Sequence, residues 1–284
     1  MTIDLTAAER FIYDDARLLD RHRLATLLRG APKERVIEAL HPYRNPDGGF
    51  GHALEPDLRG PSSEPASALH GLEVLAGVDA LDDPMVADAA AWIATIAAAD
   101  GGVPMVMPDA ADYPRAPWMV PTEGGSFLTF ALAAALLEAG GGFPWLEVAT
   151  PWCWASADRP ADLSAYWLKF ALRFLDAVPD GARAEAAIEA LRPLVDEGGF
   201  VGVPGGTDAE RLSPLDPAPQ PNSRSRALFT AEQVEADLAA LEAGQGDDGG
   251  WTFDWLAWSP GQAVEWRGAV TVRAIETLRA NGRN

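Results

Sequence analysis

Apolar residues recur at spacings of three and four along most of the chain, and runs of alternating apolar and polar residues are absent. That period is typical of helices with one buried face. Two local signals support it: Thr230 with Gln233 forms a capping box, and Asp83-Pro84 is typical of a helix start. The pattern predicts an all-α fold. The expected helices cover residues 5–28, 32–40, 62–76, 84–98, 123–138, 162–176, 182–195, 230–241 and 263–280.

The connections repeat a paired glycine, which an aromatic residue usually follows. Glycine accommodates the left-handed backbone that ends many helices, and the aromatic side chain can then anchor the turn between helices. The four copies are Asp47-Gly48-Gly49-Phe50, Asp100-Gly101-Gly102-Val103, Glu197-Gly198-Gly199-Phe200 and Asp248-Gly249-Gly250-Trp251, with a looser one at Gly141-Gly142-Phe143. We therefore expect a degenerate repeat of helix, turn, loop and helix.

Two of these segments resemble known repeats. Gln245-Gly246-Asp247-Asp248-Gly249-Gly250-Trp251 resembles the QxxxGxW repeat of squalene and other terpenoid cyclases, and Asn45 to Gly51 resembles the glycine-aromatic turn of protein prenyltransferase β-subunits. The resemblance implies an α/α toroid, a barrel of five to six inner and outer helix pairs, that spans residues 1–284 as a single domain. It also implies an apolar, isoprenoid-type small-molecule ligand in a central cavity lined by tryptophans.

The motifs that carry the usual chemistry of those families are missing. The chain has neither the Asp-x-Asp-Asp acid motif nor the Asp-Asp-x-x-Asp pattern that binds magnesium diphosphate. Its single cysteine, Cys153, and four histidines do not reproduce the zinc ligands of prenyltransferases. We therefore expect no metal site and no cofactor, with magnesium left as the one alternative, and the sequence leaves open whether the chain is an enzyme.

The loop from Gly51 to Gly60 carries the first candidate chemistry. Glu55 and Asp57 are two residues apart, with His52 and Arg59 close enough to influence their protonation. A carboxylic acid that protonates an alkene must be kept neutral by burial or by a neighbouring carboxylate, so either residue could be the general acid. The alternative is structural: an ion pair between Asp57 and Arg59, with Glu55 in solvent.

An aromatic segment near the C-terminus carries the second group of candidate catalytic and binding residues. Asp254 is a further candidate acid, and Trp255, Trp258 and Trp266 are candidate substrate contacts. Aromatic faces stabilise cations, as a carbocation reaction requires, but they also stack on sugars and pack helices together. A cavity lining and a structural role remain equal alternatives for these tryptophans.

Two irregular loops complete the set of candidates. Arg115 and Trp118 lie in the loop 105–121, which we expect at the same mouth of the barrel as Glu55 and Asp57; with Arg59, Arg115 could bind an anionic substrate group. The proline-rich passage from Leu212 to Phe229 is either a lid or a mobile surface excursion.

Charge and composition exclude several partners. The net charge of −20 disfavours nucleic acid and anionic membranes, which both attract basic surfaces. No apolar run reaches the roughly 18 residues of a membrane span, and the N-terminus does not resemble a signal peptide. With one cysteine, a reducing cytoplasm is the expected location.

Three functions remain. The first is an isoprenoid cyclase or transferase, or a binder of such a ligand. The second is a carbohydrate-active barrel that uses paired carboxylates and tryptophan platforms. The third is a non-catalytic binding module. The ligand and the oligomeric state are open.

Overall fold

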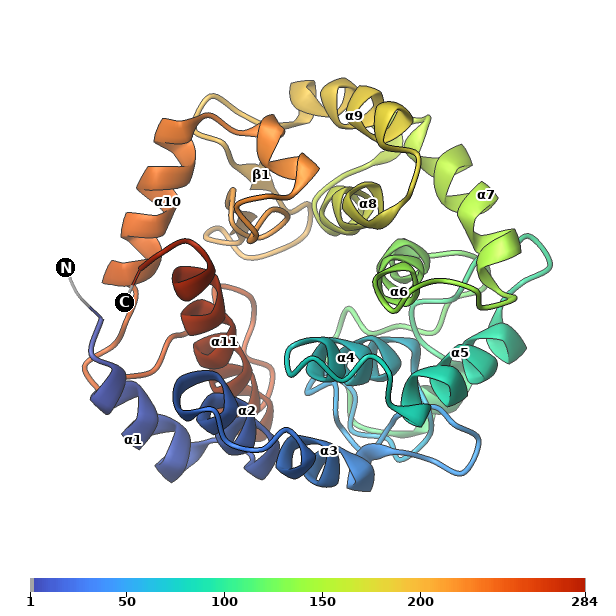
Figure 1. The fold of residues 1–284 in the computed structure, drawn as a ribbon. Coiled ribbons are helices and arrows are strands. Elements are labelled where there is room, and N and C mark those ends of the chain that lie inside the picture. The colour runs from blue at the N-terminus through green and yellow to red at the C-terminus, as the bar shows by residue number, and fades with distance from the viewer. Residues whose placement is uncertain (1–2, 284) are drawn as a thin grey trace. The chain divides into compact units, whose positions relative to one another are not determined.

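The computed structural model describes residues 3–283 and confirms that the chain is all-α (Figure 1). Its contacts divide the chain into two compact units. Unit 1 comprises the described residues up to Ala31, Leu163–Asp176, and the chain from Asp180 onward. Unit 2 comprises Pro32–Asp162 and Ala177–Pro179. The organisation as one domain stays a prediction.

Unit 1 is built around three helices that pack against one another although they come from opposite ends of the chain, as Figure 1 shows for α1, α2 and α11. A short antiparallel hairpin and single-turn 3₁₀ helices interrupt the rest of the unit. Its elements are α1 (Leu5–Asp15), α2 (Leu18–Arg29), α8 (Tyr166–Ala177), α9 (Gly181–Ala190), η4 (Arg192–Leu194), β1 (Val201–Gly202), β2 (Arg211–Leu212), η5 (Arg224–Leu228), α10 (Ala231–Ala243) and α11 (Pro260–Ala280).

Unit 2 has two helices that are buried on nearly all sides, α4 (Pro65–Ala76) and α6 (Phe127–Glu138), and these pack against each other. Such all-round burial explains why their sequences are apolar around the whole circumference. The other elements are α3 (Glu34–Leu40), η1 (His41–Tyr43), α5 (Pro84–Ile96), η2 (Pro108–Asp112), α7 (Leu146–Ala157) and η3 (Pro160–Asp162).

Three expectations about elements were wrong. The predicted helix over 5–28 is two helices, because the backbone is extended at Ala16 and Arg17. Helix α7 was missed because Pro151 lies inside it, where proline usually breaks a helix. The two-residue strands β1 and β2 are too short to give an alternating pattern. No helix among residues 3–283 is long and apolar enough to cross a membrane.

The glycine repeat is a single backbone turn that occurs four times. In each copy the first residue donates its N–H to the carbonyl four residues later, and the fourth residue donates back to the first. The fourth residue always has a positive φ, so glycine is required there. The first residues of these repeat turns are Asn45, Ala98, Asp196 and Gly246, and the fourth residues are Gly48, Gly101, Gly199 and Gly249.

The third copy is shifted by one residue relative to the sequence alignment. Gly199, the second glycine of its pair, holds the positive φ of 88°, and Phe200 therefore takes the place of the second glycine. Phe200 is only half-buried and stacks against Arg211. Its expected role as the buried anchor was wrong, since Val201 occupies that position. The four buried anchors are Phe50, Val103, Val201 and Trp251. The looser copy at 141–143 lacks these paired bonds and only ends α6.

Gln245, the glutamine of the QxxxGxW-like segment, connects the last repeat turn to the start of α1 within unit 1. The side chain of Gln245 accepts the backbone N–H of Asp4 at 2.8 Å and donates to its carbonyl at 2.8 Å. Asp4 is the N-cap of α1, so this glutamine fixes the start of the first helix against the last repeat turn.

We predict that Gln245→Ala lowers the free energy of unfolding by about 3 kcal/mol, because three hydrogen bonds of about 1 kcal/mol each are lost, two to Asp4 and one to the carbonyl of Gly249. Denaturant unfolding measures it, and hydrogen exchange should quicken selectively in α1. The exposed Gln220→Ala is the control. Equal stability of both variants would show that Gln245 does not hold α1.

Candidate functional site

The loop that follows the first repeat turn in unit 2 has an unusual backbone. His52 and Ala53 are consecutive non-glycine residues with positive φ, 54° and 59°. Each such residue costs about 1–2 kcal/mol, and strain of this kind collects at functional sites when the surrounding structure enforces it. His52 is exposed, and its Nε2 lies 2.9 Å from Asn45 Oδ1, which holds the strained turn to the repeat turn.

We predict that Ala53→Gly stabilises the protein by about 1 kcal/mol, because glycine adopts this φ without a steric penalty. Thermal unfolding of the variant against wild type measures the gain. Ala165→Gly, at a φ of 42° in unit 1, should give a gain of the same sign. Destabilisation of both variants would refute the strain.

The strained turn leads directly into two buried carboxyl groups. Glu55 is 4% exposed and Asp57 is 3% exposed, although carboxylates are rarely buried so completely. Glu55 Oε2 lies 2.8 Å from His70 Nε2 on α4, and Oε1 accepts the backbone N–H of Asp57 at 3.0 Å. The alternative of a solvated Glu55 is therefore wrong. Both of its oxygens are therefore engaged by polar groups of the protein.

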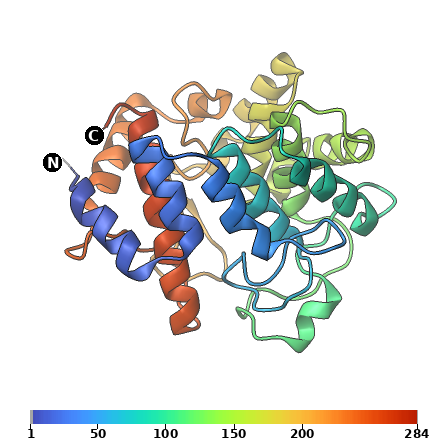
Figure 2. The ribbon, with the colours of Figure 1, turned by 60° about the horizontal axis from the view of Figure 1, so that its bottom comes forward.

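The segment 103–121, which includes the loop 105–121, contacts the loop that carries Glu55 and Asp57. The carbonyl of Asp57 accepts the N–H of Ala116 at 2.9 Å, and the N–H of Arg59 donates to Pro114 at 3.0 Å. Leu58 and Arg115 form an isolated antiparallel bridge. In Figure 2 the teal-green segment lies beyond the ends of the unit 2 helices.

The two side chains of this segment that the sequence singled out have different surroundings. Arg115 directs Nη1 at the carbonyls of Ala110 and Ala111, at 3.3 and 2.9 Å, and so fixes the end of η2. Trp118 is half-buried. Their roles as substrate contacts stay predictions.

A third buried carboxyl group, Glu64, was missed by the sequence analysis. It is 3% exposed at the N-cap of α4, and Oε2 accepts the N–H of Met107 at 2.9 Å. Burial raises the pKa of Glu64 to about 7, the amide of Met107 lowers it, and the charge of Asp109 raises it. The position before Pro65 resembles an ordinary helix cap in sequence, so only the three-dimensional structure distinguishes it.

Asp254 lies in unit 1, so it is described apart from these groups. It is exposed, and its carbonyl accepts the hydroxyl of Thr207 at 2.8 Å. Desolvation raises the pKa of Asp254, and the charges of Asp216 and Glu210 raise it further. Its role as an acid stays a prediction.

The aromatic residues around Asp254 pack on one another. Trp255 stacks on Phe253 with ring centroids 4.6 Å apart, and it meets Trp266 edge to face at 5.1 Å. Trp266 is buried and Trp258 half-buried. Trp251 is the buried anchor of its repeat turn.

The loop from Leu212 to Phe229 makes several hydrogen bonds within unit 1. Arg224 Nη1 donates to the carbonyls of Leu175 and Asp176, at 2.9 and 2.8 Å, and the hydroxyl of Ser225 donates to the Asp176 carboxylate at 2.6 Å. These contacts join the loop to the C-terminal end of α8, and its role as a lid or as a mobile excursion stays a prediction.

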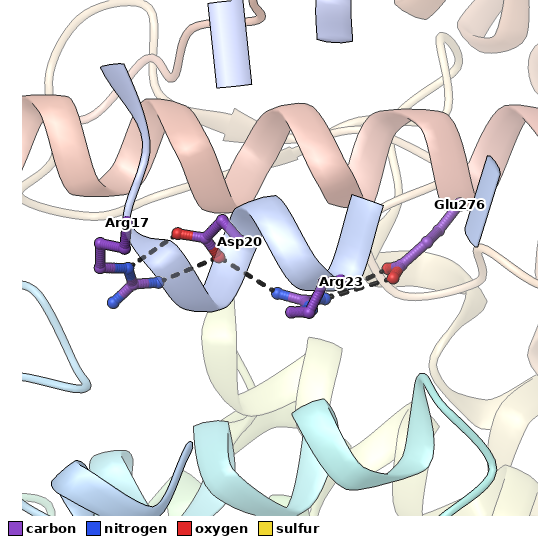
Figure 3. A network of polar contacts seen from close by, with 4 residues as sticks. All are labelled: Arg17, Asp20, Arg23 and Glu276. Atoms are coloured by element: carbon purple, nitrogen blue, oxygen red, sulfur yellow. Dashed lines mark hydrogen bonds and ion pairs between the residues drawn. The ribbon is translucent and has the colours of Figure 1, made fainter. Parts of the chain in front are cut away.

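Unit 1 also contains a buried ionic network that the sequence did not reveal (Figure 3). Asp20 on α2 is fully buried and lies 2.8 Å from Arg17 Nε and 3.7 Å from Arg23 Nη1. Arg23 Nη2 also forms an ion pair with Glu276 Oε1 of α11, at 3.3 Å. The network ties α2 to α11 and compensates the charge of Asp20.

Cys153 is buried in α7, and burial raises the pKa of its thiol well above the ordinary value. A protonated, inaccessible thiol is a poor nucleophile. Within residues 3–283 no three His, Cys, Asp or Glu side chains gather in an arrangement that could hold a metal ion.

Comparison with known proteins identifies the fold. No family model and no curated protein matches the sequence. A crystal structure of a protein from Actinoplanes is similar with a TM-score of 0.61 and 18% identity, covering 98% of this chain and 99% of that one. The type II terpene cyclase MstE from Scytonema is similar with a TM-score of 0.55 and 16% identity, over 97% and 89% of the two chains.

A variant of MstE in complex with its substrate, geranylgeranyl dihydroxybenzoate, is similar to the same degree: a TM-score of 0.55, 16% identity, and 96% and 88% coverage. At these identities the likeness concerns the fold alone. The chain has the all-α, α/α-toroid fold of terpenoid cyclases.

Proposed function

We propose that the protein binds an isoprenoid-type apolar ligand beside the buried carboxyl groups of unit 2 and transforms it by acid-initiated chemistry. The observation that carries the proposal is the burial of Glu55 and Asp57 in a strained loop. Burying carboxyl groups costs free energy, and so does the left-handed backbone that delivers them. Neither cost is needed to connect a repeat turn to a helix, which favours a chemical role.

In this proposal a buried carboxyl group beside the loop protonates a carbon–carbon double bond. Glu55, held in position by His70, is the group that stabilises the resulting cation. Asp57 remains a candidate acid from the same loop. The terpene cyclase fold supports the choice of substrate class, because a cyclase with this fold binds a geranylgeranyl compound.

Ligand binding tests the proposal first. Purified protein is heated with geranylgeranyl dihydroxybenzoate, with geranylgeranyl diphosphate, and with a panel of oligosaccharides, each with and without magnesium. A ligand at about 100 times its Kd should add about 2.7 kcal/mol of stability, a clear rise in Tm.

The arms of this panel separate the three functions. A rise with an isoprenoid alone supports the proposal. A rise with sugars alone would replace it with the carbohydrate-active alternative. No rise with any compound would contradict ligand binding of both kinds and favour the non-catalytic module.

A further inference from the structure

Glu64 occupies a capping position without acting as a cap. It is the N-cap residue of α4, where a side chain normally accepts an N–H of the first helical turn. No such bond forms, and the carboxyl group turns instead to the N–H of Met107 in the segment 103–121. Its burial is therefore not explained by the local needs of the helix.

The two carboxyl oxygens of Glu64 are not equivalent. Oε2 accepts the Met107 N–H at 2.9 Å, whereas Oε1 receives no hydrogen bond from the described residues. Oε1 is not completely buried either, so it retains a small accessible area. A proton on this carboxyl group therefore belongs on Oε1, because Oε2 already serves as an acceptor.

The charged groups around Glu64 also favour the uncharged acid. Within residues 3–283 no Lys, Arg or His forms an ion pair with it, and the charged group that acts on it, Asp109 of η2, is negative. Glu55 has different surroundings, since His70 Nε2 lies 2.8 Å from one of its oxygens and a backbone N–H donates to the other. Two carboxyl groups in such different surroundings are a common arrangement of a general acid and its partner.

Both groups are connected to the same segment of chain. Glu64 binds Met107, and the loop that carries Glu55 and Asp57 binds the segment at Ala116. The segment 103–121 therefore bridges Glu64 and the strained loop.

We propose that Glu64 is the general acid of this site and donates its Oε1 proton to a double bond of an isoprenoid ligand. This assignment rests on the proposed function. In the step, the Oε1–H bond breaks and a C–H bond forms at the less substituted alkene carbon. The positive charge then develops on the more substituted carbon, and Glu64 becomes a carboxylate. When the cyclised cation later loses a proton to water, a proton from solvent restores the acid.

The raised pKa of Glu64 agrees with this assignment, because a value of about 7 leaves a large fraction protonated at neutral pH. An ordinary glutamate would be almost fully ionised there.

Infrared spectroscopy of the protein without ligand tests the protonation state directly. The wild type should show a carbonyl band of a protonated carboxyl group that disappears with a midpoint near pH 7. Glu64→Gln should remove this band, while the exposed Glu38→Gln on α3 should leave it unchanged. Absence of the band at about pH 6, or a midpoint at the ordinary value of 4.5, would overturn the assignment.

Turnover of geranylgeranyl dihydroxybenzoate tests the catalytic role. Glu64→Gln keeps an acceptor oxygen for Met107, so it should still bind the compound but convert it at least about 100-fold more slowly. Wild-type turnover by Glu64→Gln, with Asp57→Asn inactive, would move the acid to Asp57 and leave the proposed function standing. Wild-type protein that binds no isoprenoid would refute the proposed function itself, whatever the infrared result.

Discussion

The free energy of unfolding of the wild type is expected to fall by about 3 kcal/mol as pH rises, and Glu64→Gln is expected to remove this fall. The pKa of Glu64 is about 7 in the folded protein and 4.5 as its ordinary value. Between these values the folded state binds more protons than the unfolded state, so the free energy of unfolding falls with increasing pH. A difference of about 2.5 pKa units corresponds to about 3 kcal/mol. Glutamine does not titrate, so the variant should be the more stable protein above about pH 7.

Urea unfolding at about pH 4.5 and at about pH 8 measures this effect in both proteins. Other groups titrate over the same interval, so the quantity to compare is the difference between variant and wild type. Glu38→Gln provides the matched control at an exposed glutamate. A parallel pH dependence in wild type and Glu64→Gln would mean that Glu64 has an ordinary pKa. A stabilising substitution that also removes turnover would be typical of a residue kept for function at the expense of stability.

Gly249→Ala is expected to destabilise the protein by about 4 kcal/mol or more, which for a single substitution is exceptional. Gly249 has a φ of 94°, and a Cβ atom there would lie 2.3 Å from the carbonyl carbon and oxygen of Ala7 in α1. Neither backbone can move without separating the last repeat turn from the first helix. Gly101→Ala in unit 2 should be similarly severe, since its Cβ would lie 2.6 Å from the backbone of Val148 in α7.

Gly140→Ala separates the cost of the positive φ from the cost of the steric clash. Gly140 has nearly the same φ, 96°, but an added Cβ would meet nothing within 4 Å. It should therefore report the backbone cost alone, about 1–2 kcal/mol. Denaturant unfolding of both variants gives the comparison. Equal losses at Gly140 and Gly249 would show that the close approach of turn and helix contributes nothing.

The repeat turns explain why much of the fold was predictable. The positive φ of Gly48, Gly101 and Gly249 requires glycine. The side chain of the aspartate before each of them accepts the N–H of the second glycine of the pair. Both requirements can be recognised in the sequence as an Asp-Gly-Gly motif. The third turn has the same backbone with Gly199 in that place and Phe200 after it, so spacing alone assigned it to the wrong register.

Element boundaries were predictable only where a local signal sets them. The Thr230 capping box and the Asp83 cap are present as expected. Helix α7 contains Pro151 in its interior, which contradicts the local preference and is tolerated through packing of residues such as Trp145 and Cys153. Tertiary contacts decide such cases, and a single sequence does not record them.

The candidate site was predictable in part. Adjacent carboxylates in an irregular loop marked Glu55 and Asp57, and their pairing with the segment that carries Arg115 followed from the order of the helices. Glu64 had no such signal, because its importance comes from burial and from Met107, which is 43 residues away. The fully buried Asp20 of unit 1 was missed for the same reason.

Conversion of geranylgeranyl dihydroxybenzoate in heavy water is the most direct test of acid-initiated chemistry. Proton-initiated cyclisation rearranges bonds without a leaving group, so the product in ordinary water should have the mass of the substrate. In heavy water the acid carries deuterium, and the product should be heavier by one deuterium at a carbon that does not exchange. Mass spectrometry should find this product with wild-type protein and not with Glu64→Gln. A product of unchanged mass in heavy water, or bound substrate that is never converted, would contradict the account.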